Sequence, residues 1–273
     1  MSIVLALAIL VTTLVVVAGI AAPLLVPHDP LEQNVIDRLQ PPMFMPGGSA
    51  DHILGTDHLG RDVLARLVYG ARIALAVGGL AVAVSALLGL LIALIGGYYG
   101  GAVDALLMRL LDVQLSMPFM LLALAIVGIY GPSVGNIILV LTITGWVVYA
   151  RVVRAEVLSL RTREFVVACR SLGGSNARII VRHLLPNVAP SLVVLAALEI
   201  GRMMLLESAL SFLGLGIRPP YPSWGSMLAD GRAYVASAWW LATCPGLAVS
   251  FTVLSLNIVA DRLRDALDSS LEI

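Results

Sequence analysis

The sequence predicts an all-α membrane protein with six transmembrane helices, and two observations carry that prediction. Hydrophobic residues make up 59% of the 273-residue chain and charged residues only 12%, which is too apolar for a soluble domain of this length. The apolar residues are also gathered into long runs, and a run of about 20 is what a helix needs to cross a bilayer. The chain therefore belongs to the membrane class.

Six apolar runs are long enough to span the hydrocarbon core. The first is longer than the roughly 7 to 15 residues of a secretory signal's apolar region, and no basic residue precedes it, so we expect a retained span. The third is the least regular, because Arg109 and Asp112 lie in its first turns. The expected spans are 3–26, 73–95, 105–129, 137–153, 188–213 and 237–259.

The orientation follows from the arginines between the spans. The segment 151–186 and the residues after the last span carry nine arginines, whereas the loops 27–70 and 214–236 carry five. Because loops rich in Arg and Lys remain on the cytoplasmic side, we expect segment 151–186 and both chain ends to be cytoplasmic.

The two loops assigned to the outer side differ in character. Proline and glycine exclude regular structure from the first part of loop 27–70, but residues 59–67 place apolar and charged side chains at helical period. They predict a short amphipathic helix on the outer membrane face. Loop 214–236 combines LGLG, PPYP and Trp224, and we expect it to be irregular. A gate element, a docking surface for a substrate-delivering protein and an interfacial aromatic anchor all remain open for it. The aromatic residues expected as interfacial anchors elsewhere are Tyr98, Tyr99, Trp239 and Trp240.

Lysine is absent, since all 17 basic residues are arginines. A P-loop requires the lysine of G-x-x-x-x-G-K-[ST] to reach the nucleotide's phosphates. If the protein's work uses ATP, hydrolysis must therefore take place on another chain, and we expect no cofactor here. The 17 acidic residues balance the arginines, so no global basic field suggests a nucleic-acid partner.

The segment EFVVACRSLGGSNARIIVRHLLPN, residues 164–187, is basic although apolar runs flank it. Gly173 is expected to end a first short helix, Ser175 to cap a second over 176–185, and Pro186 to break the chain before the next span. Helices below about 12 to 15 residues are marginal in water, so the segment is either held by a partner or lies on anionic headgroups. The apolar residues expected to share one face are Phe165, Val166, Cys169 and Leu172.

The same segment resembles the EAA loop of ABC importer permeases. In that loop two small residues, three spacers and a glycine lead, after nine more residues, to a hydrophobic-x-Leu-Pro element. Ala168 and Cys169 match the small pair, Gly173 matches the glycine, and His183–Pro186 stands at the closing element. Val167 replaces the glutamate after which the loop is named.

Longer blocks resemble the C-type permease of dipeptide, oligopeptide and nickel importers. They are LGTDHLGRDVLARLVYGAR, EFVVACRSLGGSNARIIVRHLLPN, ESALSFLGLGIRPPYPSWGSML and LNIVADRLRDALD. The chain departs from the family at its start, at Ala260 and at Ser269. The resemblance implies a type I ABC importer permease fold with a cytoplasmic coupling helix, in a bacterial inner membrane. It implies as partners a second homologous permease, two ATPase subunits that use ATP and Mg, and an extracytoplasmic binding protein.

The resemblance also implies roles for residues and segments. The coupling helix seats in a groove on an ATPase and transmits nucleotide-driven closure to the spans. The implied domains are an N-terminal helix (1–26), an extracytoplasmic loop (27–70), a permease core (71–262) with coupling loop 154–186, and a cytoplasmic tail (263–273). The residues implied in ATPase coupling are Glu164, Ala168, Cys169, Arg170, Gly173, His183 and Pro186.

Three charges fall inside the fifth span. Glu199 and Arg202 lie near its middle and Glu207 further out. Ionised groups at that depth are costly unless paired or hydrated. They either line the substrate pathway, where they would contact a peptide's charged termini, or Glu199 and Arg202 form a structural pair one helical turn apart. The structural pair is slightly favoured.

Loop 27–70 also contains possible metal ligands, namely His52, Asp57, His58 and Asp62. Capping and solvation explain two histidines and two acids better than a metal does, so no metal site is expected. HExxH and GxSxG motifs are absent, so no catalytic residue is expected either. The alternative function is a self-sufficient ion-coupled secondary transporter using the three charges of the fifth span, although no internal repeat supports it.

Overall fold

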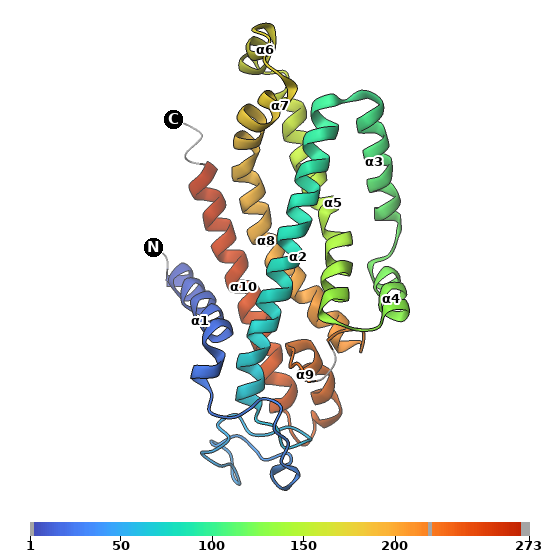
Figure 1. Cartoon of the computed structure of the whole chain (residues 1–273). Coiled ribbons are helices and arrows are strands. Elements are labelled where there is room, and N and C mark those ends of the chain that lie inside the picture. The colour runs from blue at the N-terminus through green and yellow to red at the C-terminus, as the bar shows by residue number, and fades with distance from the viewer. Residues whose placement is uncertain (1–2, 218–219, 269–273) are drawn as a thin grey trace. The chain divides into compact units, whose positions relative to one another are not determined.

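The computed structural model describes residues 3–217 and 220–268, and its regular structure there is helical. Five helices are long and apolar enough to cross a membrane, and a sixth span exists if the broken pair α3 and α4 counts as one (Figure 1). The expectation of an all-α membrane protein is thus confirmed. The helices are α1 (Ile3–Leu25), α2 (Val63–Tyr99), α3 (Gly101–Ser116), α4 (Phe119–Tyr130), α5 (Val134–Leu160), α6 (Glu164–Ser171), α7 (Asn176–Ile179), α8 (Leu185–Phe212), α9 (Trp224–Gly231) and α10 (Trp240–Asp268).

Contacts divide the chain into two compact units, and long helices contribute a part to each. The first unit comprises Met1–Gly79, Ala123–Ile138 and Ile200–Val259, and the second comprises Leu80–Leu122, Leu139–Glu199 and Ala260–Ile273. Each unit has its own apolar core. The first is built around Val63, Met204, Trp224, Trp240 and Leu241, and the second around Leu94, Tyr98, Val157, Val166 and Ile179.

Helix α1 packs against the beginning of α2 through a small residue. A Cβ added at Gly19 would lie 2.8 Å from the Leu75 side chain, so a larger residue would push the helices apart. Close to its end α1 contains Pro23, and Ala21 two residues earlier leaves helical geometry. This kink has an identifiable cause, because proline cannot donate a backbone hydrogen bond and its ring crowds the preceding turn.

Helix α2 is longer than expected and includes residues 63–67 of the segment 59–67 assigned to a separate amphipathic helix. At 1.5 Å per residue its 37 residues extend about 55 Å. Asp62 precedes its first residue and accepts a hydrogen bond from Ala65 N–H at 2.6 Å, so the helix begins there. No proline interrupts the following residues. The short amphipathic helix was therefore a wrong prediction, and its charged face is buried rather than laid on the membrane.

The third expected span is broken into α3 and α4 at Met117 and Pro118. Proline disfavours helical geometry at the residue before it, and Met117 is extended (φ −88°, ψ 119°). Pro118 O then accepts from Leu121 N–H and Leu122 N–H, which starts α4. The single span 105–129 is thus replaced by two helices.

Pro186 does not break the chain, contrary to expectation. A π-helical turn at Ile180–Leu184 joins α7 to α8, and Pro186 is the second residue of α8. In the π turn Leu185 N–H donates to Ile180 O, so the wider turn adjusts the hydrogen-bond register directly before the proline. Pro186 has no N–H to continue the hydrogen-bond ladder, and the wider π turn directly before it accommodates this gap without ending the helix.

Loop 214–236 contains regular structure, which corrects the second loop expectation. Ser223 forms a capping box with Ser226, and α9 follows over Trp224–Gly231. Trp224 is buried rather than exposed as an interfacial anchor. Helix α10 continues to Asp268, so residues 263–268 of the expected tail are helical, and 269–273 lie outside the described residues.

Candidate functional site

The segment 164–187 starts with α6, and two glycines end this helix. Gly173 has φ +79°, the left-handed conformation expected at this position. Gly174 N–H donates to Cys169 O at 2.9 Å, and a Cβ added at Gly174 would lie 2.6 Å from Cys169 Sγ. The first glycine is therefore needed for its backbone conformation and the second for its small size.

A side-chain cap starts the next helix. Ser175 Oγ accepts a hydrogen bond from Arg178 N–H at 3.3 Å, which confirms the predicted N-cap of α7. Val166 of α6, Ile179 of α7 and Leu184 of the π turn are all fully buried in the core of the second unit. The segment is thus packed into its unit at three points.

Tyr98, near the end of α2, connects both short helices to that span. Its hydroxyl donates to Asn176 Oδ1 at 2.7 Å, and the Arg170 guanidinium lies over its ring at 5.5 Å from the centroid. Tyr98 is buried, so its expected role as an interfacial anchor is wrong, whereas its neighbour Tyr99 is exposed. Sequence reasoning missed this residue because its partner lies 78 positions away.

Two arginines of the same unit fix α5 near segment 164–187. Arg154 forms two hydrogen bonds of 2.5 Å with the Asp104 carboxylate of α3. Arg161 donates to Gly97 O of α2 at 2.9 Å. Paired hydrogen bonds between a guanidinium and a carboxylate fix orientation as well as distance. Helices α2, α3 and α5 are therefore joined to one another, and α6 and α7 pack against α2 and α5 in the same unit.

The apolar face expected on α6, formed by Phe165, Val166, Cys169 and Leu172, is only partly covered. Val166 is buried and Cys169 half-buried, but Phe165, Val167 and Leu172 are exposed, Leu172 by 89%. A single exposed leucine does not indicate a binding surface, because isolated apolar side chains are common on protein surfaces. Phe165 and Leu172, however, are seven residues apart and project from the same side of α6, where they form an uncovered apolar surface, while Val167 is exposed on another side.

The residues implied in ATPase coupling are exposed or half-buried. Cys169 and His183 are half-buried, and the His183 ring lies 6.2 Å from that of Phe165. The remaining residues of the set are exposed, namely Glu164, Ala168, Arg170, Gly173 and Pro186.

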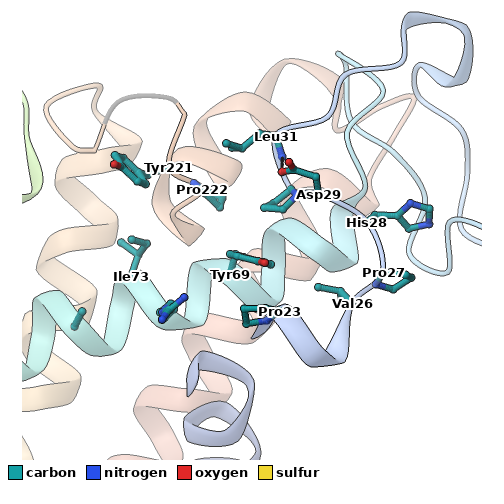
Figure 2. A pocket seen from close by; sticks show the side chains of 13 residues that line it. Pro23, Val26, Pro27, His28, Asp29, Leu31, Tyr69, Ile73, Tyr221 and Pro222 are labelled. Atoms are coloured by element: carbon teal, nitrogen blue, oxygen red, sulfur yellow. Dashed lines mark hydrogen bonds between the residues drawn. The ribbon is translucent and has the colours of Figure 1, made fainter. Parts of the chain in front are cut away.

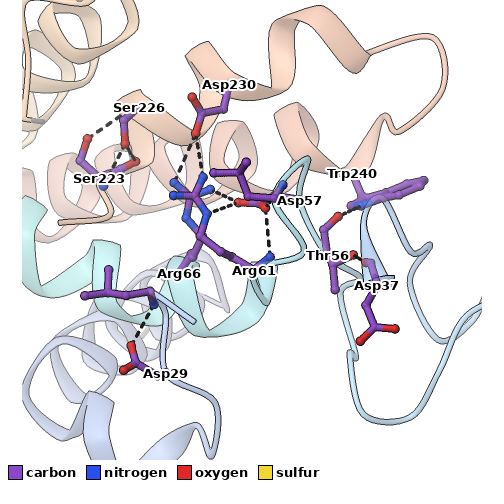
Figure 3. A network of polar contacts seen from close by, with 12 residues as sticks. Asp29, Asp37, Thr56, Asp57, Arg61, Arg66, Ser223, Ser226, Asp230 and Trp240 are labelled. Atoms are coloured by element: carbon purple, nitrogen blue, oxygen red, sulfur yellow. Dashed lines mark hydrogen bonds and ion pairs between the residues drawn. The ribbon is translucent and has the colours of Figure 1, made fainter. Parts of the chain in front are cut away.

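A second polar site lies in the first unit, where α2 and α9 meet. We refer to Asp57, Arg61, Arg66 and Asp230 as the α2–α9 ion-pair cluster (Figure 3). Asp57 Oδ2 pairs with Arg61 Nε at 2.7 Å and with Arg66 Nη1. Both guanidiniums also approach Asp230 Oδ2, at 3.4 and 3.3 Å. The cluster thus joins the start of α2 to α9.

Electrostatics keep the central carboxylate of this cluster ionised. Burial acts to raise the pKa of the Asp57 carboxyl, but Arg66, Arg61 and the backbone N–H groups of Leu59 and Arg61 outweigh it. The pKa of Asp57 is therefore held below its ordinary value.

Two buried tryptophans strengthen the same region. Trp224 Nε1–H donates to Leu67 O of α2 at 2.8 Å, and a Cβ at Gly70 would lie 2.7 Å from the Trp224 ring. Trp240 Nε1–H donates to Thr56 O at 3.3 Å. Trp240 is buried and so is not the expected interfacial anchor, whereas Trp239 is exposed.

A cavity of about 650 Å³ opens beside the end of α1 in the first unit (Figure 2). Pro23, Tyr69, Ile73, Tyr221 and Pro222 give it a largely apolar wall, and Asp29 and Arg72 add opposite charges. Its volume lies in the range of small-molecule sites, roughly 300–1,000 Å³. No residue predicted for the substrate pathway lines it.

The three charges of the fifth span differ in burial. Glu207 is fully buried and accepts a hydrogen bond from Ser211 Oγ at 2.7 Å, with Ser208 Oγ at 3.4 Å. Glu199 is buried, and Arg202 is exposed. The serines around Glu207 give its carboxyl the hydrogen bonds that a buried polar group requires.

The possible metal ligands of the outer loop are not brought together as a set. Asp57 belongs to the ion-pair cluster, and the His58 ring stacks on Tyr234 with centroids 5.7 Å apart. His52 Nδ1 and Asp62 Oδ2 are hydrogen-bonded, and a ligand atom of His28 lies within 4.8 Å of theirs. His28 was not among the possible ligands expected from the sequence.

Comparisons with known proteins identify the family to which this chain of apolar spans belongs. Residues 85–273 match the family described as binding-protein-dependent transport system inner membrane component. The chain belongs to this family and is an ABC importer permease.

The chain is similar to named permeases over nearly its full length. It is 42% identical over 259 residues to the di/tripeptide transport system permease protein DppC of Pseudomonas aeruginosa, covering 95% of this chain and 86% of that protein. It is 44% identical over 259 residues, with the same coverage, to the dipeptide transport system permease protein DppC of Escherichia coli K12. The inward-facing MetNI methionine ABC transporter shares the fold, with a TM-score of 0.60 at 20% identity over 75% of this chain and 97% of that chain.

Proposed function

We propose that the chain is the permease subunit of an ATP-driven importer of dipeptides and oligopeptides and forms half of the translocation pathway. A second homologous permease supplies the other half, and an extracytoplasmic binding protein delivers the substrate. Two ATPase subunits bind ATP and Mg, because a chain without lysine has no P-loop. The names of the relatives support peptides rather than nickel as the substrate.

The observation that carries the proposal is the combination of an uncovered apolar surface and a fixed attachment in segment 164–187. Phe165, Val167 and Leu172 are exposed, while Val166 is buried. A partner that covers this surface gains the free energy of apolar burial, about 25 cal/mol per Å². We infer that the partner is the ATPase subunit. The uneven distribution of arginines supports a cytoplasmic position for the segment and for both chain ends.

The attachment explains how movement of the ATPase reaches the spans. A displacement of α6 acts on Tyr98 through Arg170 and acts on α2 and α5 through the buried Val166. Asn176 adds a hydrogen bond from α7 to the same tyrosine. Because packed interiors are dense and hardly compressible, α6 moves together with the ends of α2 and α5. The segment therefore acts as a rigid connection rather than as a loop.

The proposal is tested by Leu172→Asp in the full chain, expressed with its permease and ATPase partners. Ile36→Asp is the matched control, since Ile36 is 93% exposed and Leu172 is 89% exposed, and Ile36 lies far from the segment in sequence. We expect Leu172→Asp to reduce the ATPase recovered with the purified permease by at least about tenfold, the equivalent of 1.4 kcal/mol. Ile36→Asp should retain it.

Membrane insertion is checked by the amount of each variant in the membrane fraction. Full ATPase recovery with Leu172→Asp would contradict the proposed contact. Peptide uptake by the chain alone in liposomes, driven by an ion gradient, would contradict the assignment as a transport subunit and favour the secondary transporter.

A further inference from the structure

We propose that His28, His52 and Asp62 form a binding site for a divalent transition-metal ion such as Zn²⁺ or Ni²⁺. His28 follows the end of α1, His52 lies in the connecting loop, and Asp62 caps α2. Each offers one ligand atom, and these atoms lie within 4.8 Å of one another. This site is independent of the ATPase contact and lies entirely in the first unit.

The separation of the three atoms suits a metal after a small adjustment. Zinc bonds of about 2.0–2.2 Å in tetrahedral geometry place ligand atoms roughly 3.3–3.6 Å apart. The three ligand atoms, which now lie within 4.8 Å of one another, reach this separation if their side chains move by about 1 Å. His28 and His52 are both half-buried and their ring centroids are 5.1 Å apart, so the two imidazoles are already adjacent.

Hydrogen bonds already orient all three ligands. His28 Nε2 lies 2.9 Å from Asp51 O, and since a carbonyl oxygen only accepts, Nε2 carries the hydrogen and Nδ1 keeps its lone pair. A histidine that ligates a metal commonly donates its other ring N–H to a carbonyl or carboxylate in this way. His52 Nδ1 lies 2.9 Å from Asp62 Oδ2, so this imidazole and carboxylate are held side by side.

The surroundings favour a cation. A cavity of about 250 Å³ adjoins the three residues, and its remaining lining contributes four more carboxylates, those of Asp29, Glu32, Asp37 and Asp51. No arginine lines this cavity among the described residues. Clefts lined by one sign of charge concentrate ions of the opposite sign. The cavity therefore attracts a cation and provides room for the waters that complete its coordination.

The ligand set selects the class of metal. Imidazole nitrogens suit Zn²⁺, Ni²⁺ and Cu²⁺, whereas Mg²⁺ and Ca²⁺ prefer sets made only of oxygen. An ion bound here would join the end of α1 to the start of α2 across the loop between them. Its binding energy would stabilise the folded state by mass action, so metal binding raises the thermal stability of the chain.

The test uses the full chain in detergent, purified without a histidine tag, stripped with a chelator and titrated with Zn²⁺ or Ni²⁺. His58→Ala is the matched control, because His58 lies in the same loop but stacks on Tyr234 outside the cluster. We expect one tightly bound ion per chain in the unmodified protein and in His58→Ala. His28→Ala and His52→Ala should each weaken binding at least tenfold and abolish the metal-dependent rise in melting temperature.

Folding of the variants is followed by size exclusion and helical circular dichroism without metal. Should His28→Ala unfold, His28→Gln, which retains a polar side chain, replaces it. Absence of binding above the detergent blank would overturn the proposal. Equal affinity in all variants would also overturn it, because the ion would then be bound elsewhere.

Discussion

Tyr98 donates its hydroxyl hydrogen to Asn176 Oδ1 at 2.7 Å and so joins the end of α2 to the first turn of α7. The Arg170 guanidinium lies over the same ring, so one tyrosine contacts both short helices of segment 164–187. In the proposed function this residue lies between the ATPase contact and the span that must move.

Tyr98→Phe removes the hydrogen bond and retains the ring under Arg170. We expect a loss of stability of about 0.5–1.5 kcal/mol and a larger loss of coupling, in which ATP hydrolysis continues but transports less peptide. The ratio of peptide taken up to ATP hydrolysed measures this. Tyr99→Phe is the control, since Tyr99 is exposed, and an unchanged ratio in Tyr98→Phe would show that the hydrogen bond transmits nothing.

Gly174→Ala should disturb segment 164–187 more than a helical glycine substitution elsewhere. The new Cβ would approach Cys169 Sγ to 2.6 Å and Cys169 O to 2.7 Å, and the backbone oxygen cannot turn away as a side chain can. We expect a loss of about 1–3 kcal/mol, as for other overpacked positions. Gly79→Ala in α2 is the control, because nothing lies within 4 Å of its added Cβ. Thermal unfolding in detergent compares the two, and equal melting temperatures would refute the expected clash.

Asp57→Asn leaves two buried guanidiniums without the carboxylate that they share. Removing one partner of a buried ion pair costs about 3–5 kcal/mol, so this variant should be strongly destabilised. Asp230→Asn should cost less, because Asp230 is half-buried and its contacts with the arginines are 3.3 and 3.4 Å. Denaturant unfolding ranks the two, and the reverse order would show that Asp230 rather than Asp57 is the main partner.

The same carboxylate makes stability depend on pH in the acid range. Because the folded-state pKa of Asp57 is below its ordinary value of 3.8, the charged form stabilises the folded state at pH values above 3.8. This contribution is lost as the pH falls from 3.8 through the lowered folded-state pKa. As the pH is lowered below 3.8, the melting temperature of the unmodified chain should fall more steeply than that of Asp57→Asn. Parallel curves would show that Asp57 does not titrate there.

Trp224→Phe tests the attachment of α9 to α2. Phenylalanine retains most of the buried ring but cannot donate to Leu67 O, and it leaves space where the indole was. We expect a loss of about 1–3 kcal/mol, whereas Trp239→Phe at an exposed site should be near neutral. Limited proteolysis in loop 214–236 reports local release of α9, and equal cleavage of both variants would contradict the attachment.

Local patterns determined much of this protein. The long apolar runs predicted the spans, because a helix in lipid must satisfy all its backbone groups internally and must be about 20 residues long. Ser175 and Gly173 marked the ends of short helices, because a side-chain cap and a left-handed residue act within one turn. The absence of lysine excluded a P-loop without any structure.

Tertiary structure decided what local patterns leave open. Residues 59–67 have the same amphipathic period whether they face a membrane or a protein interior, and Asp230, which pairs with their arginines, lies more than 160 positions away. Tyr98 and Asn176 are separated by 78 positions, and His28 meets His52 and Asp62 only after the loop has folded. Helical period and capping depend on neighbours within a few residues. Burial, ion pairing and ligand sets depend on which distant segments pack together, and a single sequence does not carry that information in its local pattern.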